Sequence, residues 1–383
     1  MTEKPANVVL ISMDTLRADV AYKGNFKLIE LLLKKGVVFE NAVSSVPLTP
    51  PSHATVFTGL NPPRHGIRHL LKEKLNPEVT TLAELLQAQG YQTGGVVSCP
   101  GMNSWYDLNR GFDIYDDEIP PLADGRDAVE LADVKLRGTA LKRAPRVTQI
   151  ANEWLDRLDP SKPFFLFAHY FDAHWPYNAP DKPLRKLANA YEEEVAYADH
   201  YANLLVEHIE TLTDGFDNTL LIVFSDHGED LAGWYDNDHA GKMGCPQEEG
   251  HGCLLFEATQ HVPLAMMGLN LPVGVSISDQ VRLCDVMPTI AELIGMKIAD
   301  DLDGHSLVRL IEGTEKGHRP AYFETFFPEE LATQNNKFSH LKPLRGVKIE
   351  NKFKVIWQEG NDRVEIYDLE NDPEERSPTI LCP

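Results

Sequence analysis

The chain has 383 residues, of which 43% are hydrophobic and 25% are charged, a composition typical of a globular protein that buries a large core. Its formal net charge of -22 argues against nucleic acid or an anionic membrane surface as the main partner. A small anionic substrate stays compatible with this charge because a bound cation can invert the local field. No run of about 18 apolar residues is present, so we expect no membrane insertion.

The cysteines and the first residues of the chain are typical of a protein in a reducing cellular compartment. The five cysteines are scattered and contain no C-x-x-C pair, which fits a reducing environment without a disulfide framework. The first residues, MTEKPANVVLISMD, lack the basic start and long apolar core of a secretory signal. We therefore expect a cytoplasmic protein. No sequence feature predicts an oligomeric state.

Short apolar runs rich in β-branched residues alternate with helical patterns along most of the chain. Such runs are typical of strands buried on both faces of a parallel sheet, and the alternation predicts a layered α/β fold. The polar stretch 101–138 is expected to be a surface excursion that lines the mouth of an active site. Strands are expected at 7–13, 92–98, 164–171, 219–224 and 261–267, and helices at 25–35, 54–57, 81–90, 145–158, 191–211 and 281–295. Short strands at 347–350, 353–357 and 364–367 indicate an antiparallel appendage.

Thr49 occupies a distinctive local setting. A loop containing Pro47, Pro50 and Pro51 leads into the apolar run 54–57, which predicts a short helix with Thr49 just before its N-terminus. Free backbone N–H groups and the helix dipole favour an anion at such a place. A hydroxyl there can attack a phosphate or sulfate centre, although this stretch alone is more typical of a threonine that caps an ordinary helix.

Three expected strands end in residues of the kinds that bind metals. Asp14 follows the first, Asp172 and His174 follow the strand at 164–171, and Asp226 and His227 follow the strand at 219–224. The carboxyl ends of parallel strands meet at one edge of a sheet, where ligands bind. The sequence therefore predicts a convergent metal site, and two carboxylates with one imidazole suit Mn²⁺ or Zn²⁺.

The expected chemistry of this site is nucleophilic. A divalent ion that also binds the Thr49 oxygen would lower the pKa of the hydroxyl and offset charge on the transferred group. His174 and His251 are the candidates for protonating the leaving group or for donating to the oxyanion. We expect the substrate to be a small anionic ester.

The chain resembles the sulfatase branch of the alkaline phosphatase superfamily along nearly its whole length. The resemblance implies a large α/β/α sandwich around a mostly parallel mixed sheet. It also implies a catalytic domain at 1–320 and a small C-terminal antiparallel β subdomain at 321–383. The segments that carry it are VVLISMDTLRADV (8–20), PLTPPSHATVFTGLNPPRHG (47–66), HYFDAHWPY (169–177), FSDHGE (224–229), HGCLLFEATQHVPL (251–264), RLCDVMPTIAELIG (282–295) and EIYDLENDPEE (365–375).

The resemblance assigns roles by position. It implies that Asp14, Asp226 and His227, together with Thr49, bind the metal ion. It implies that Thr49 is the nucleophile, and that His174 and His251 contact the transferred group. His174 and His251 could also hold a second ion together with Asp172. We expect a single ion, because Asp172-x-His174 is tighter than the D-x-x-x-H spacing of the two-metal relatives.

Several positions depart from the family pattern. Sulfatases carry a cysteine or serine, matured to formylglycine, where this chain has Thr49, and an arginine where it has His53. Asp14 is followed by Thr15 rather than by a second aspartate, and His227 stands where sulfatases have asparagine. This ligand set is less typical of a calcium site than of a transition-metal site.

These departures bear on the substrate. Threonine cannot become formylglycine, and a sulfated threonine lacks the exit by which formylglycine hydrate ejects sulfate. A phosphorylated threonine can be hydrolysed, as in the threonine-nucleophile relatives that act on phosphoesters. We therefore predict a metal-dependent hydrolase of phosphate mono- or diesters, resembling a phosphodiesterase. The alternatives are a sulfuric ester hydrolase on the same scaffold and a catalytically silent binding protein.

Overall fold

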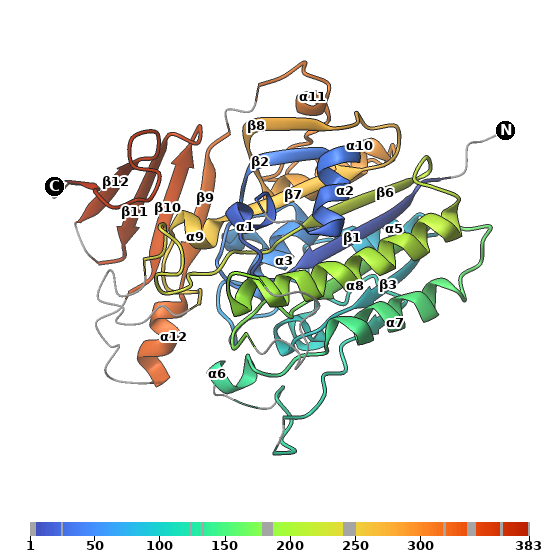
Figure 1. The fold of residues 1–383 in the computed structure, drawn as a ribbon, viewed down its shortest axis with the longest axis horizontal. Coiled ribbons are helices and arrows are strands. Elements are labelled where there is room, and N and C mark those ends of the chain that lie inside the picture. Colours follow the sequence, from blue (N-terminus) through green and yellow to red (C-terminus); the bar gives the residue numbers. More distant parts are fainter. Residues whose placement is uncertain are drawn as a thin grey trace.

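The structure is a computed structural model that describes residues 5–23, 26–122, 124–129, 131, 134–177, 187–239, 250–316, 319–334, 342–360 and 363–381. Its centre is an eight-stranded sheet in which all neighbours are parallel except β7, which runs antiparallel to both β6 and β2 (Figure 1). In sheet order the strands are β4 (Ile114–Asp116), β3 (Gln92–Val96), β5 (Phe164–Tyr170), β1 (Asn7–Met13), β6 (Thr219–Phe224), β7 (His261–Met267), β2 (Val37–Val43) and β8 (Val275–Arg282).

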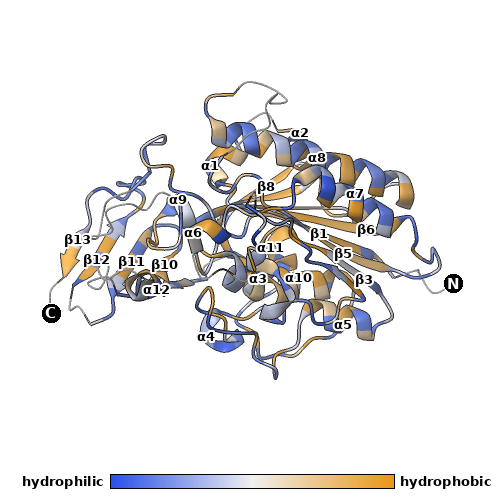
Figure 2. Ribbon diagram, turned by 90° about the horizontal axis from the view of Figure 1, so that it is seen from below, coloured by the Kyte–Doolittle hydropathy of each residue, from blue (hydrophilic) through white to orange (hydrophobic). Residues whose placement is uncertain are grey.

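Helices cover both faces of this sheet, as Figure 2 shows. Side chains of β1 alternate between the two cores: Val8 and Leu10 belong to one, and Val9 and Ile11 to the other. This alternation, with every residue of β1 buried, confirms the predicted three-layer sandwich. One layer contains α2 (Lys27–Lys35), α7 (Ala144–Leu155) and α8 (Ala190–Thr213), and the other contains α3 (Thr49–Thr58), α5 (Leu82–Ala88) and α10 (Val286–Leu293).

One predicted helix begins later in the structure than expected, and one strand of the central sheet lacks a prediction. The helix expected at 281–295 begins only at Val286, because Val281 and Arg282 extend β8 and pair with β2. Asp285 then accepts a hydrogen bond from the backbone N–H of Arg282 at 2.9 Å, which helps to turn the chain into α10. Strand β2 was not predicted, although its apolar ends Val37–Phe39 and Ala42–Val43 are buried as in the neighbouring strands.

The stretch 101–138 is only partly a surface excursion. Met102, Tyr106 and Leu108 are buried in the core, and β4 pairs with β3 at the edge of the main sheet. The prediction of a surface excursion therefore holds for only part of this stretch, in which Gly101, Arg137 and Gly138 line the cavity described below. Shorter elements of the described chain are α1 (Ala18–Ala21), α4 (Pro62–His65), η1 (Pro100–Met102), η2 (Ser104–Tyr106), α6 (Val134–Arg137), α9 (Glu257–Gln260), η4 (Leu283–Asp285), α11 (Val308–Ile311) and α12 (Phe327–Gln334).

A second, antiparallel sheet lies beside one end of the sandwich and confirms the predicted appendage (Figures 1 and 2). Its inner face packs with residues 253–256 of the larger unit, so apolar contacts cross between the sheets. The domain division at residue 320 stays a prediction. The strands are β9 (Ala321–Thr325), β10 (Leu344–Ile349), β11 (Phe353–Gln358), β12 (Val364–Asp368) and β13 (Thr379–Leu381).

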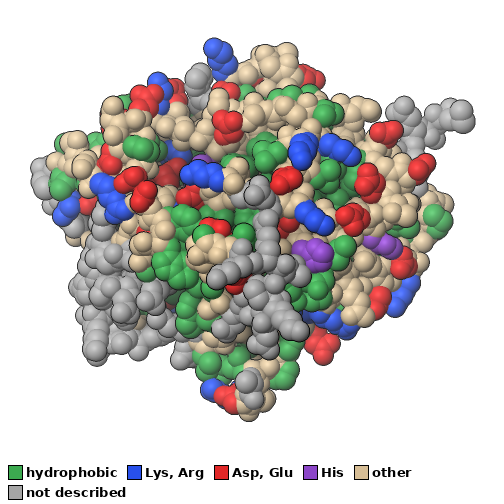
Figure 3. Space-filling model, in the orientation of Figure 1, with side chains coloured by type: hydrophobic (Ala, Val, Ile, Leu, Met, Phe, Trp, Pro, Cys, Tyr) green, Lys and Arg blue, Asp and Glu red, His purple; other side chains and the backbone are tan. Residues whose placement is uncertain are grey.

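Acidic and basic side chains are interspersed over the face shown in Figure 3. Among the described residues, no helix has the length and apolarity needed to cross a membrane.

Candidate active site

The candidate site lies where β1 and β6 end side by side. The two strands are parallel and in register, with Ser12 opposite Phe224, so the residues that follow them emerge at the same edge of the sheet. Asp14 and Asp226 both follow at this edge, and both are fully buried. The sheet therefore brings two carboxylates together from positions far apart in the chain.

Thr49 lies directly against these carboxylates. It is the first residue of α3, so it belongs to the helix rather than preceding it. Its Oγ1 donates a hydrogen bond to Asp14 Oδ2 at 3.1 Å and lies 3.4 Å from His227 Nε2. The predicted anion site of free backbone N–H groups is weakened here, because the next two residues, Pro50 and Pro51, carry no N–H. The contribution of this helix end is therefore the Thr49 hydroxyl itself.

Asp14, Asp226 and His227 form a group whose ligand atoms all lie within 4.8 Å of one another. Asp14 Oδ1 and Asp226 Oδ2 are buried and accept no hydrogen bond. A buried carboxylate oxygen without a partner is costly, and a cation removes that cost. His227 donates from Nδ1 to the carbonyl of Gly228 at 3.0 Å, which leaves the Nε2 lone pair free to bind a metal ion. The residues therefore fit the divalent ion that the sequence predicts.

Neighbouring residues fix the geometry of this group. Thr15 adopts a left-handed backbone conformation, with φ of 57°, and donates its N–H to Asp226 Oδ1 at 3.3 Å. Ser52 Oγ donates to the Asp226 carbonyl at 2.7 Å and so ties α3 to the end of β6. His53 lies between the Thr49 carbonyl, at 2.8 Å, and Ser12 Oγ, at 2.9 Å. Burial lowers the pKa of His53 to about 3, so this ring positions Thr49 as a neutral group.

Burial raises the pKa of two carboxyl groups in the site, those of Asp14 and Glu229. Burial raises the pKa of Asp14 to about 7, against the opposing effects of His227 and Thr49. Burial likewise raises the pKa of Glu229 to about 8. In the absence of a cation, both carboxyl groups therefore retain protons that an exposed carboxyl group has lost.

This difference predicts the pH dependence of the metal-free protein. The unfolded chain releases these protons near its ordinary carboxyl pKa of about 4, so the free energy of unfolding falls as the pH rises from about 4 to about 8. Burial raises the pKa of Asp14 from 3.8 to about 7. Asp14→Asn should therefore reduce this pH-dependent loss of stability by an amount on the order of 4 kcal/mol. Urea unfolding in the presence of a chelator measures both curves. Equal slopes in the two proteins would contradict the prediction.

Thr49 lines a cavity together with the two histidines that the sequence predicts for the site. His174 and His251 both line it, and their ring centroids lie 4.9 Å apart. Apolar side chains of Leu48, Leu70, Phe171, Trp175 and Phe327 form much of the remaining wall, with Cys99, Arg137 and Glu229.

The two histidines differ in what they can do. His174 Nδ1 lies 2.7 Å from the Trp175 carbonyl, which can only accept, so Nδ1 carries the hydrogen and Nε2 is an acceptor. His174 therefore suits the acceptance of a proton better than the donation that the sequence predicts. His251 Nδ1 lies 3.2 Å from Glu229 Oε1. Sequence reasoning gave no role to Glu229, whose signal was its place in the segment FSDHGE.

Among the described residues, Asp172 neither lines the cavity nor joins a ligand group, although the resemblance left open a part for it in a second metal site. Its carboxylate accepts hydrogen bonds from the Ala144 N–H, at 3.0 Å, and from the Arg143 guanidinium, at 3.3 Å. Arg143 also pairs with Glu194 at 2.9 Å. Asp172 therefore anchors the start of α7 on the end of β5.

We expect Asp172→Asn to affect stability and leave metal binding intact. The change removes the charge that pairs with Arg143, which is one-third exposed, so the free energy of unfolding should fall by about 1–3 kcal/mol. Denaturant titration and metal analysis of the purified protein measure the two quantities. Loss of bound metal in this variant would contradict its assignment as a structural residue.

His169 was also missed as a site residue. It lies on β5 opposite Ser12 of β1, and its Nε2 is 3.0 Å from Asp14 Oδ2. The available signal in the sequence was a histidine near the end of an otherwise apolar strand, followed by the segment YFDAH (170–174). Its pairing with Asp14 depends on the order of the strands in the sheet.

Comparison with known families gives a consistent result. A family described as Sulfatase matches residues 6–296, and one described as N-sulphoglucosamine sulphohydrolase, C-terminal, matches residues 252–380. Arylsulfatase K of Mus musculus is 23% identical over 381 residues, covering 84% of this chain and 68% of that protein. The rat protein of that name is 22% identical over 364 residues, covering 80% of this chain and 63% of its own length. The chain thus spans about two thirds of these relatives.

Solved structures share the fold. BT4656 in complex with its substrate D-glucosamine-2-N,6-O-disulfate superposes with a TM-score of 0.75 at 16% identity, covering 98% of this chain and 93% of that one. The phosphonate monoester hydrolase of Agrobacterium radiobacter superposes with a TM-score of 0.74 at 19% identity, covering 97% of this chain and 91% of that one. The same scaffold therefore occurs in proteins named for sulfate and for phosphonate substrates.

Proposed function

This chain belongs to the sulfatase family of ester hydrolases, and we propose that it is a metal-dependent hydrolase of sulfate monoesters with Thr49 as its nucleophile. The observation that carries the proposal is the position of Thr49 Oγ1, which faces the cavity and lies beside Asp14 and His227. The names of the matching family and relatives favour a sulfate ester as substrate over the phosphate ester that the sequence predicts.

The charge of the site supports a substrate with a single negative charge. A divalent cation held by Asp14, Asp226 and His227 would balance the two carboxylates. Among the described residues that line the cavity, Arg137 is the one lysine or arginine. Burial lowers the pKa of His251 to about 4, so this ring is neutral at pH 7. A sulfate monoester and a phosphodiester each carry one charge, whereas a phosphate monoester carries nearly two.

The side chains divide the first step between them. Thr49 Oγ1 attacks sulfur, and its new bond forms as the bond from sulfur to the leaving alcohol oxygen breaks. The Thr49 hydrogen, which already points to Asp14 Oδ2, passes to that oxygen. His251 gives its Nε2 hydrogen to the leaving oxygen while Glu229, a carboxyl group whose pKa is raised by burial, passes its own proton to His251 Nδ1. A bound divalent ion supplies Lewis-acid chemistry: it lowers the pKa of the hydroxyl and offsets charge on the transferred group.

The second step releases the enzyme. A water molecule attacks the sulfur atom and passes one proton to His174 Nε2, while the bond from sulfur to Thr49 Oγ1 breaks and Asp14 Oδ2 returns the hydrogen to Thr49. His174 then loses its added proton to solvent, and Glu229 regains one. The Nδ1–H of His174 stays bound to the Trp175 carbonyl throughout, which fixes the ring. Its stacking on Phe171, with centroids 4.1 Å apart, adds a second constraint.

A phosphodiester is the second candidate, and Thr49 itself favours it. An unmodified threonine releases a phosphoryl group to water more readily than a sulfuryl group, because it lacks the route by which formylglycine hydrate ejects sulfate. We expect Mn²⁺ or Zn²⁺ rather than Ca²⁺ in either case, because His227 supplies a nitrogen ligand.

Initial rates on p-nitrophenyl sulfate, bis(p-nitrophenyl) phosphate and p-nitrophenyl phosphate test the proposal. The protein is reconstituted separately with Mn²⁺ and Zn²⁺. We expect the sulfate ester to have the highest kcat/KM, and both monoanions to exceed the phosphate monoester. A higher kcat/KM for the diester would establish the second candidate. Metal binding without turnover of any ester would favour the silent binding protein.

A further inference from the structure

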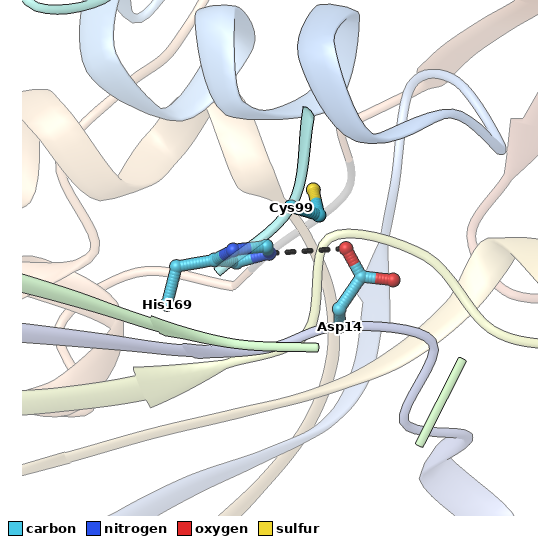
Figure 4. Close-up of side chains that lie close together, drawn as sticks. All are labelled: Asp14, Cys99 and His169. Atoms are coloured by element: carbon cyan, nitrogen blue, oxygen red, sulfur yellow. Dashed lines mark hydrogen bonds and ion pairs between the residues drawn. The ribbon is translucent and has the colours of Figure 1, made fainter. Parts of the chain in front are cut away.

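Asp14 belongs to two groups of potential ligands, and the second does not include Asp226 or His227. Asp14, Cys99 and His169 offer one ligand atom each, and these atoms lie within 4.8 Å of one another. All three residues are at most 2% exposed. Figure 4 shows the His169 ring and the Cys99 sulfur on the same side of the Asp14 carboxylate.

The fold brings these three residues together from separate strands. His169 is the sixth residue of β5, next to β1 in the sheet. Cys99 follows β3, the neighbour of β5 on its other side, and precedes the short helix η1. The three residues therefore emerge from adjacent parallel strands at the edge where the candidate site lies.

The two oxygens of Asp14 are available to different groups. Oδ2 lies 3.0 Å from His169 Nε2 and accepts the hydrogen bond of the Thr49 hydroxyl at 3.1 Å, whereas Oδ1 accepts no hydrogen bond. In Figure 4 the second oxygen points away from His169 and Cys99. One carboxylate can thus bind two ions, one through each oxygen.

We propose that Asp14, Cys99 and His169 form a second transition-metal site that shares the Asp14 carboxylate with the site at Asp226 and His227. Thiolate, imidazole and carboxylate together are the ligands that Zn²⁺ prefers. Cys99 lines the same cavity as Thr49, so the fourth position of a tetrahedral ion is open to a substrate oxygen. This assignment does not rest on which ester the protein cleaves.

Binding requires a small rearrangement with a defined proton balance. Ligands of a tetrahedral zinc ion lie about 3.4–3.7 Å apart, so the side chains close by roughly an ångström. His169 exchanges its hydrogen from Nε2 to Nδ1, where Ser98 Oγ, at 3.1 Å, accepts it. The Cys99 thiol releases one proton to solvent, and affinity therefore rises with pH. The sequence predicted a single ion and left Asp172, His174 and His251 as the alternative ligands of a second; this site uses Cys99 and His169 instead.

Cobalt substitution tests this site without reference to activity. A cobalt–thiolate bond produces a charge-transfer absorption that carboxylate and imidazole ligands lack. We expect this band in the cobalt-loaded wild-type protein and its loss in Cys99→Ser, with zinc content falling from about two ions per chain to about one. The matched control is Cys284→Ser, another buried cysteine, which should keep the band. A wild-type protein without the band, or a Cys99→Ser variant that retains it, overturns the proposal.

Two further measurements separate this site from the first. Asp226→Asn should remove the first ion and leave the cobalt–thiolate band in place. X-ray absorption of the zinc-loaded wild-type protein should show a sulfur ligand at about 2.3 Å, which needs no variant to fold. A spectrum without sulfur at saturating zinc overturns the second site, while the proposed hydrolase is judged independently from the ester panel.

Discussion

Thr49→Ala is expected to lower kcat by about 10⁴-fold or more while the protein still folds and binds metal. Removal of the attacking group of a covalent hydrolase has effects of this size, because the remaining site acts only through binding and electrostatics. Thr49 is the hydroxyl that faces both Asp14 and the cavity. The fold should survive because Asp14 Oδ2 keeps His169 as a partner at 3.0 Å, and the Thr49 carbonyl still accepts from His53.

Thr49→Ser is the matched control, since it keeps the hydroxyl and removes only a methyl group. Its kcat should stay within about 10-fold of wild type. Rapid-quench mass spectrometry of the wild-type protein should detect a modified peptide containing Thr49. Turnover of Thr49→Ala within about 10-fold of wild type would mean that water attacks the substrate directly. Thr49 would then only orient the substrate.

Asp226→Asn is expected to weaken binding of the first ion by at least about 100-fold and to abolish turnover with it. Loss of even an indirect support of a metal ligand costs 10–100-fold in affinity, and a direct ligand should cost more. Asparagine keeps an acceptor for the Thr15 N–H, and its amide can donate to His227 Nε2, which lies 3.3 Å from Asp226 Oδ2. The metal-free variant should therefore be at least as stable as the metal-free wild-type protein.

Calorimetric titration with Zn²⁺ and Mn²⁺, together with thermal unfolding with and without metal, measures these effects. Asp172→Asn is the matched control, because it removes a buried carboxylate of similar size outside the ligand group. The wild-type protein should gain stability on metal addition from both ions, and Asp226→Asn should gain less, because it keeps only the ion at Cys99 and His169. An equal gain in both proteins would show that Asp226 is not a ligand.

Several features of the site could be predicted from the sequence because they depend on local patterns. A run of buried, β-branched residues ends where its apolar character ends, so the strands ending before Asp14 and Asp226 could be located from the sequence. Parallel strands place such ends at one edge, and the structure brings together Asp14, Asp226, His227 and Thr49 as predicted. The C-terminal antiparallel sheet was evident from its short alternating strands.

The partners of individual side chains depended on the tertiary structure. Asp172 and His169 lie on the same strand end, three residues apart, yet Asp172 meets Arg143 and His169 meets Asp14. Successive residues of a strand point to opposite faces, and which neighbour each meets depends on strand order and on the loops that follow. The hydrogen position on His174 likewise depends on a carbonyl that only the folded loop presents.

The sequence by itself determined the layered α/β fold and placed Asp14, Asp226, His227 and Thr49 at the ends of their strands and helix, because each of these depends on residues that are close in the chain. The tertiary structure decided that Cys99 and His169 join Asp14, that Glu229 supports His251 and that Asp172 leaves the site. These contacts link residues 22 to 155 positions apart, and short-range patterns carry no information on such distances. They arise when neighbouring strands bury their apolar faces in one register and bring the polar residues at their ends into contact.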